Sequence, residues 1–125
     1  MGVNSARQAG QIERGDSAMH YNLRKAGAYT VIEWTGNVDM SAAPDAREQI
    51  LECLDDGQDL LLDMSAVSYI DSSGVAVLVE GHQTASKLDL QFGLVAPSRA
   101  VMDVLKLARM EEILSIHASI GNLGT

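Results

Sequence analysis

The sequence has few of the features that mark secreted and membrane proteins. Its single cysteine, Cys53, cannot form an internal disulfide, and the first residues lack the basic and apolar stretches of a secretory signal peptide. No apolar run is long enough to cross a bilayer, so direct membrane insertion is not expected. A length of 125 residues with 46% hydrophobic residues suits one soluble domain with a modest core. These absences together predict a protein of the reducing cytoplasm.

Basic residues are also scarce. Nine Lys and Arg residues face 17 Asp and Glu residues, which gives a formal net charge of -8. Such a chain would repel a phosphate backbone, and no cluster of basic residues interleaved with aromatics offsets this charge. Nucleic acid is therefore not an expected partner, and the acidity by itself only weakly favours a basic protein partner.

The first 17 residues differ in composition from the rest of the chain. They are rich in Gly, Ser and Gln and have little apolar content, so they cannot repay the entropy of ordering. We expect residues 1–17 to form a flexible tail and residues 18–125 to form the folded domain.

Hydrophobic periodicity predicts a regular order of strands and helices in the folded part. Two strands surround a turn at Lys25–Gly27, and Pro44 and Gly57 bound an amphipathic helix. After this helix we expect a short strand over Leu60–Asp63, a loop over 64–71 and a helix from 72 to about Lys87. An alternating strand over Leu88–Leu94, a helix capped by Ser98 and a strand over Ile113–Ile116 are expected to follow. This order, β-β-α-β-α-β-α-β, predicts an α/β fold in which a hairpin precedes parallel strands joined by crossover helices.

Three further residues are interpreted as structural. Trp34 is expected in the packing of the hairpin, since aromatics make up only 4% of the chain. Cys53 lies at helical spacing with apolar neighbours and is expected to be a small buried residue. His82 shares a helix face with apolar residues and is expected to be a half-buried structural histidine.

The run Asp71-Ser72-Ser73-Gly74 places two hydroxyls and a carboxylate at the start of a predicted helix. A catalytic serine needs a base within hydrogen-bond reach. His82 lies ten residues further along the same helix, roughly 15 Å away, and nothing in the sequence directs His20 or His117 towards Ser72. The chain also lacks a G-x-S-x-G elbow and a serine followed three residues later by lysine. We therefore predict no catalytic residue.

Metal and nucleotide sites are not predicted either. No Cys/His set has ligand spacing, and neither phosphate-binding glycine motif occurs. Asp71 together with Asp39 could in principle hold a cation, but two carboxylates are a weak signal in such an acidic chain. The sequence therefore predicts neither a metal nor a cofactor.

Helix capping is the simplest structural interpretation of the same run, because Asp and Ser oxygens accept bonds from the free amides of a first helical turn. One cap would be sufficient, however, and Gly74 costs about 1 kcal/mol of helix stability relative to Ala. The excess of polar groups favours a contact surface. A phosphoryl group on a hydroxyl here would be tolerated by the positive end of the helix, but it would disturb a partner docked against it.

The stretch from Leu61 to Gly74, LLDMSAVSYIDSSG, resembles the signature of STAS domains, in particular bacterial anti-sigma factor antagonists. Gly36-Asn37-Val38-Asp39 resembles a second family motif, and Pro97-Ser98 at a helix start resembles a third. The resemblance runs from about Met19 to about His117. It implies the STAS fold, a mostly parallel sheet with alternating helices.

The resemblance implies a partner switch. Such antagonists bind an anti-sigma factor that is also a serine kinase, which phosphorylates the first Ser of the motif, here Ser72; a metal-dependent serine phosphatase reverses the reaction. Asp71, Ser73 and Gly74 would belong to the docking surface, and Asp39 would lie on a neighbouring loop. ATP and Mg²⁺ would belong to the kinase, so the chain itself would be a non-enzymatic binder and substrate.

Two departures keep alternatives open. Ala76 stands where many members have a second glycine, and the segment 119–125 is too short and Gly-rich for the helix that usually ends the family's domain. The missing helix would uncover a surface for a dimer or a second partner. One alternative is a STAS subunit bound to the ATPase or permease of a lipid-transport ABC transporter; another is an adaptor in a different signalling pathway.

Overall fold

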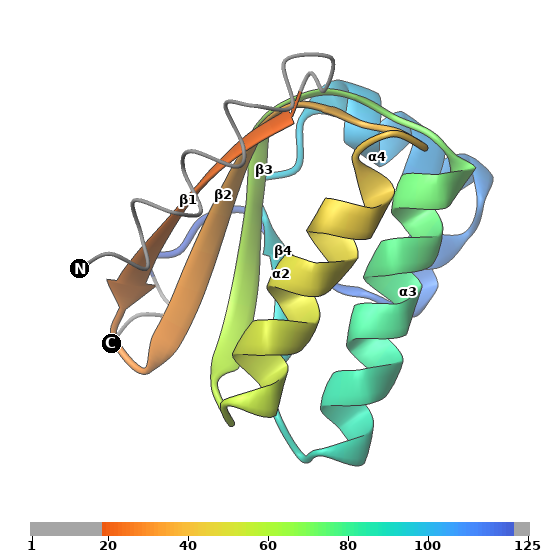
Figure 1. Ribbon diagram of the computed structural model, residues 1–125. Helices are drawn as coiled ribbons and strands as arrows, with labels where there is room; N and C mark the ends of the chain where they lie inside the picture. The colour runs from red at the N-terminus through yellow and green to blue at the C-terminus, as the bar shows by residue number, and fades with distance from the viewer. Residues whose placement is uncertain (1–18, 122–125) are drawn as a thin grey trace.

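The structure is a computed structural model that describes residues 19–121 (Figure 1). The predicted flexible tail, residues 1–17, lies outside the described residues. In chain order the elements are β1 (Met19–Ala26), β2 (Tyr29–Val38), α2 (Ala43–Asp55), β3 (Asp59–Ile70), α3 (Ser72–Lys87), β4 (Phe92–Val95), α4 (Arg99–Leu107), the 3-10 helix η1 (Met110–Glu112) and β5 (Ser115–His117).

One five-stranded sheet has the order β1-β2-β3-β4-β5. β1 pairs with β2 antiparallel, whereas each later pair is parallel, so the expected hairpin followed by parallel strands is confirmed. Parallel strands end at the same edge of a sheet, and the antiparallel β1 begins there. The sheet edge that receives the carboxyl ends of β2 and β3 therefore also holds the start of β1.

The main core lies between one face of the sheet and the helices. Figure 1 shows α2 and α3 side by side across that face. The core combines apolar residues of the sheet with residues of α2, α3 and α4, among them Ile50, Leu78 and Leu105. Leu61, between Leu60 and Leu62 of β3, is buried on the opposite face with Val31 and Val95. Burial on both faces explains why β3 begins as a continuous apolar run.

Several predicted structural residues have the expected positions. Trp34 is buried, and its Nε1 donates a hydrogen bond of 2.7 Å to Oε1 of Gln49, which joins β2 to α2. Gly57 ends α2 with a φ of 78°, as the sequence predicted. Cys53 and His82 are both half-buried, so Cys53 is less buried than expected whereas His82 agrees with its prediction.

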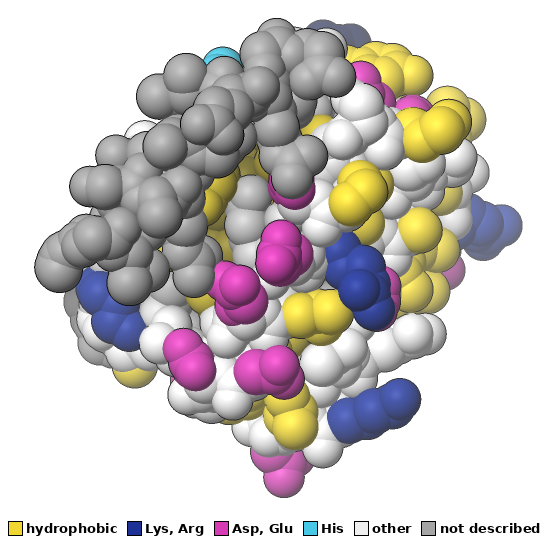
Figure 2. All heavy atoms as spheres, viewed as in Figure 1, with side chains coloured by type: hydrophobic (Ala, Val, Ile, Leu, Met, Phe, Trp, Pro, Cys, Tyr) yellow, Lys and Arg dark blue, Asp and Glu magenta, His cyan; other side chains and the backbone are white. Residues whose placement is uncertain are grey.

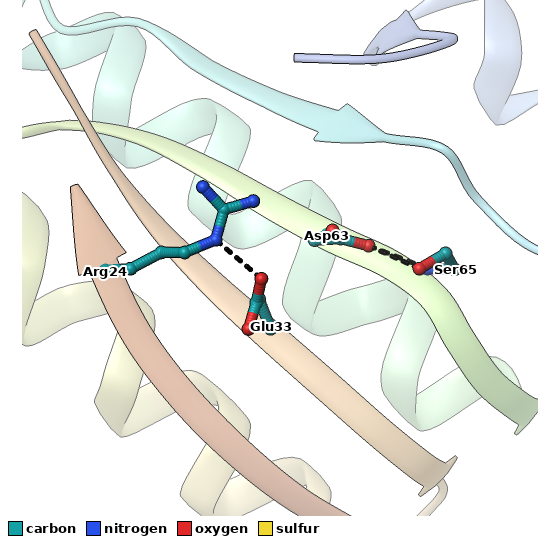
Figure 3. A network of polar contacts seen from close by, with 4 residues as sticks. All are labelled: Arg24, Glu33, Asp63 and Ser65. Atoms are coloured by element: carbon teal, nitrogen blue, oxygen red, sulfur yellow. Dashed lines mark hydrogen bonds and ion pairs between the residues drawn. The ribbon is translucent and has the colours of Figure 1, made fainter. Parts of the chain in front are cut away.

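The predicted loop over 64–71 is wrong, because β3 continues to Ile70. The strand absorbs extra residues as bulges: Glu33 pairs with Asp63, but Thr35 pairs with Ala66. At this bulge Oδ1 of Asp63 accepts hydrogen bonds from the N–H and hydroxyl of Ser65, at 3.0 and 2.8 Å (Figure 3). The polar residues that indicated a loop therefore stabilise an irregular part of a strand.

The last strands begin later than predicted. Leu88 caps the end of α3, and Asp89 has a positive φ of 60°, so the strand that was expected from Leu88 begins at Phe92. The insertion of η1 likewise shifts the expected strand over Ile113–Ile116 to Ser115–His117. Among the described residues no helix follows β5; residues 122–125 of the predicted non-helical segment lie outside them.

The acidic balance of the chain is visible on the helical face. Figure 2 shows acidic side chains gathered on the part of the surface formed by α2. The helix and its C-cap carry five carboxylates, at Asp45, Glu48, Glu52, Asp55 and Asp56. In residues 19–121 no helix is both long and apolar enough to span a bilayer.

Candidate functional site

The connections that follow β2 and β3 lie next to each other at one edge of the sheet. Figure 1 shows them running side by side above the helices. The N–H of Asp71 donates to the carbonyl of Val38 at 3.4 Å, and the N–H of Met40 donates to Oδ2 of Asp71 at 3.2 Å. The structure thus brings the Gly36–Asp39 motif against the start of the Asp71–Gly74 motif, in the arrangement that the family resemblance implied.

Asp71 is the residue that caps α3. Its backbone is extended, and its Oδ1 accepts hydrogen bonds from the N–H groups of Ser73 and Gly74, at 2.9 and 3.2 Å. With the bond from the N–H of Met40 to Oδ2, the carboxylate both accepts bonds from the free N–H groups at the start of α3 and holds the connection between β2 and α2. The capping function that the sequence assigned to this run therefore belongs to Asp71.

Ser72 is the first residue of α3, and it is exposed. Within residues 19–121 its hydroxyl makes no hydrogen bond, so the fold does not use this oxygen for capping. Ser72 lies at the N-terminal end of α3, a helix of 16 residues. The N-terminal end of a helix dipole is positive and favours negative charge there. The hydroxyl is thus accessible, and its position tolerates an anion.

Asp39 organises the loop between β2 and α2. Its Oδ1 accepts bonds from the Ser41 hydroxyl at 2.8 Å and from the N–H groups of Ser41 and Ala42 at 3.1 and 3.2 Å. The Ser41 hydroxyl is the largest cause of a lowered pKa of the Asp39 carboxyl; desolvation opposes it, and the two N–H groups reinforce it. Asp39 therefore remains ionised and holds the loop in shape.

Gly74 lies in the first turn of α3 and is buried. A Cβ on this residue would lie 2.4 Å from the carbonyl oxygen of Val38 and 2.6 Å from Cγ1 of Ile70. The absence of a side chain allows the helix start to approach the ends of β2 and β3 closely. A partner would therefore contact the neighbours of Gly74, of which Ser73 is half-buried and Ser72 exposed.

The three histidines of the described residues lie on different elements. His82 lies in the third turn of α3, and His117 ends β5. His20 is exposed at the start of β1, which borders the same sheet edge, but no histidine of residues 19–121 is hydrogen-bonded to Ser72. Those residues also contain no group of three His, Cys, Asp or Glu side chains placed to hold a metal ion.

The third motif anchors the start of α4 to β3. Ser98 caps α4 as predicted: its Oγ accepts a bond from the N–H of Val101 at 3.3 Å. The same hydroxyl donates to the carbonyl of Val67 at 2.6 Å, and the N–H of Ser98 donates to the carbonyl of Met64 at 3.2 Å. Both hydrogen-bonding functions of the Ser98 hydroxyl are thus used within the fold, in contrast to the Ser72 hydroxyl.

Two exposed apolar residues at the site were not predicted from the sequence. Met40 follows Asp39, and Tyr69 lies two residues before Asp71; their side chains are 73% and 52% exposed. The available signal was the presence of large apolar side chains directly beside both motifs. The exposure of Tyr69 could not be predicted from this signal alone. It follows only once β3 is known to continue through Tyr69, because alternate side chains of a strand then point away from the core.

The division of roles between Asp71 and Ser72 leads to a stability prediction. Asp71→Ala removes the helix cap and is expected to lower the free energy of unfolding by about 1–2 kcal/mol. Ser72→Ala removes a hydroxyl that caps nothing, so a change within about 0.5 kcal/mol is expected. Urea denaturation of both variants measures this difference; an equal loss in the two variants would contradict the assignment of the cap.

Comparison with known proteins identifies the family. The STAS domain model matches residues 20–123. The anti-sigma-B factor antagonist of Bacillus subtilis (strain 168) is 28% identical over 83 residues, which cover 66% of this chain and 76% of that protein.

Solved structures share the fold. An anti-sigma factor antagonist from Mycobacterium paratuberculosis superposes with a TM-score of 0.76 at 22% identity, covering 83% of this chain and 89% of the other. The Bacillus cell fate determinant SpoIIAA in its phosphorylated form gives a TM-score of 0.65 at 19% identity, covering 83% and 96%. The match of the family model to residues 20–123 shows that the chain belongs to the STAS domain family.

Proposed function

We propose that this protein is an anti-sigma factor antagonist whose binding to a serine-kinase anti-sigma factor is controlled by reversible phosphorylation of Ser72. The observation that carries the proposal is the exposed Ser72 hydroxyl at the start of α3, beside an aspartate that already caps the helix. The anti-sigma-B factor antagonist of Bacillus subtilis and the phosphorylated form of SpoIIAA support it as relatives in sequence and fold. The site of action is the cytoplasm, where the kinase has ATP.

The chemistry belongs to the partners. The Ser72 oxygen attacks the γ-phosphorus of ATP in the kinase, the bond to the β–γ bridging oxygen breaks, ADP leaves and the hydroxyl proton passes to a base of the kinase. Hydrolysis by a serine phosphatase restores the hydroxyl and releases inorganic phosphate. This chain contributes the acceptor and its recognition, and it needs no cofactor of its own.

The phosphoryl group changes binding more than folding. It adds a charge of about -1.5 to -2 at a helix start, where the helix dipole stabilises negative charge. A docked partner would instead meet a dianion near the carboxylates of Asp71 and Asp39. Both carboxylates accept hydrogen bonds from the connection between β2 and α2. Asp39, Asp71 and Ser73 shape the docking surface, and Gly74 sets the position of Ser72 by letting α3 approach the strand ends.

Phosphate mapping tests the proposal. Incubation with the cognate serine kinase and Mg²⁺-ATP is expected to add one phosphate at Ser72, located by mass spectrometry of peptides. Ser72→Ala should remain unmodified, whereas Ser98→Ala should still accept phosphate at Ser72. Phosphate on Ser72→Ala, or none on the wild type, would refute it. The alternative of a subunit on a lipid-transporter ATPase or permease predicts a stable complex without modification, so the same experiment separates the two.

A further inference from the structure

Two of the exposed apolar side chains of the domain lie at the proposed docking site. Met40 is on the connection after β2, and Tyr69 is at the end of β3. The other large exposed apolar residues among those described lie elsewhere: on the edge strand β1, at the end of α3, at the end of α4 and after η1 (Leu23, Leu88, Leu107, Ile113).

Both residues belong to the two backbone segments that meet at Asp71, the residue before Ser72. The N–H of Met40 donates to Oδ2 of Asp71, the residue that directly precedes Ser72. Tyr69 pairs with Asn37 of β2, and alternation along the strand places Ile70 in the core and Tyr69 on the outside. The two apolar side chains therefore belong to the two segments that converge on the acceptor.

The local sequence does not require Met40 to be exposed. Asp39-Met40-Ser41 and Asp63-Met64-Ser65 are the same tripeptide, and in both the serine hydroxyl donates to Oδ1 of the aspartate at 2.8 Å. Met64 is fully buried, whereas Met40 is 73% exposed. The exposure of Met40 thus results from its place at the sheet edge, where a flexible apolar side chain is well suited to contact a partner.

The carboxylates at the site are engaged within the fold. Asp71 accepts three hydrogen bonds from backbone N–H groups, and Oδ1 of Asp39 accepts three bonds from Ser41 and Ala42. A strongly basic partner surface would also attract a phosphorylated Ser72, which is the opposite of release. These features favour an apolar contact over a salt-bridged one.

We propose that Met40 and Tyr69 are the apolar anchors by which this domain docks into an apolar recess of the serine-kinase anti-sigma factor, and that they make binding sensitive to phosphorylation. This inference rests on the proposed function. Docked anchors exclude water from the space around Ser72. A neutral hydroxyl is dehydrated at small cost, whereas a phosphate dianion is dehydrated at large cost, so the anchors turn one modification into release.

Calorimetric titration of the kinase with the full chain tests the anchors. Met40→Ser and Tyr69→Ser are each expected to weaken binding of the unphosphorylated protein about tenfold or more. Because both side chains are exposed, the melting temperature should stay near that of the wild type. Met40→Leu and Tyr69→Phe keep the apolar surface and should bind within about twofold of the wild type. Leu107→Ser is the matched control, since Leu107 is 86% exposed on α4.

The outcomes separate this inference from the proposed function. Wild-type protein that binds only when unphosphorylated, together with serine variants that bind as tightly as the wild type, would overturn the anchors alone. A loss for Leu107→Ser as large as for Met40→Ser would also overturn them. Wild-type protein that neither binds the kinase nor accepts phosphate would overturn the proposed function and the anchors with it.

Discussion

Gly74→Ala is expected to lower the free energy of unfolding by about 3 kcal/mol, although it adds only one methyl group. The new Cβ would lie 2.4 Å from the carbonyl oxygen of Val38 and 2.6 Å from Cγ1 of Ile70. The first atom belongs to the backbone of a buried strand end, and the second to a buried side chain, so neither can move cheaply. The start of α3 must shift instead.

Two glycine variants control for this prediction. A Cβ on Gly121 has its nearest neighbour at 3.6 Å, so Gly121→Ala should change stability by less than about 0.5 kcal/mol. Gly57 has a φ of 78°, and a Cβ there would meet no atom within 4 Å, so Gly57→Ala should cost only the left-handed backbone, about 1–2 kcal/mol. Denaturant titration ranks the three; Gly74→Ala no more costly than Gly121→Ala would contradict the packing argument.

Ser72→Asp is expected to weaken binding to the serine kinase about 100-fold, because an unfavourable charge at a docked surface costs several kcal/mol. The melting temperature should remain within about 2 °C of the wild type, since a carboxylate at the start of a helix is favourable. Calorimetry with the kinase and a thermal melt of the variant measure both effects.

The matched control is Gln83→Glu, which adds one negative charge to α3 at a position further along the helix. It should bind the kinase as the wild type does, because it lies away from the helix start. Equal losses for the two variants would mean that net charge, and not the position of Ser72, governs binding. An unchanged affinity of Ser72→Asp would contradict the switch.

The sequence predicted the order of the elements because their apolar periods are strong. The hairpin, the helix between Pro44 and Gly57 and the cap at Ser98 depend on local chemistry, and all three are present. The second half of β3 was not predictable in the same way. Ser65 and Ser68 are exposed polar residues, and only pairing with β2 through two bulges makes their segment a strand.

At the site, residue types were predictable but their division of labour was not. Asp and Ser both cap helices, so only the structure shows that Asp71 bonds the N–H groups of α3 and leaves Ser72 unused. Gly74 was predicted to be part of the docking surface, but it is buried because the start of α3 lies close to Val38, a residue 36 positions earlier. The exposure of Met40 likewise depends on where two distant segments meet.

If the state of Ser72 decides whether the serine kinase binds, the two forms of the protein must differ in affinity. Protein phosphorylated at Ser72 is separated from unmodified protein, and the affinity of the kinase for each form is measured before and after phosphatase treatment. We expect tight binding of the unmodified form, weak binding of the phosphorylated form and full recovery once the phosphate is removed. Equal affinity of the kinase for the two forms would contradict the proposed switch.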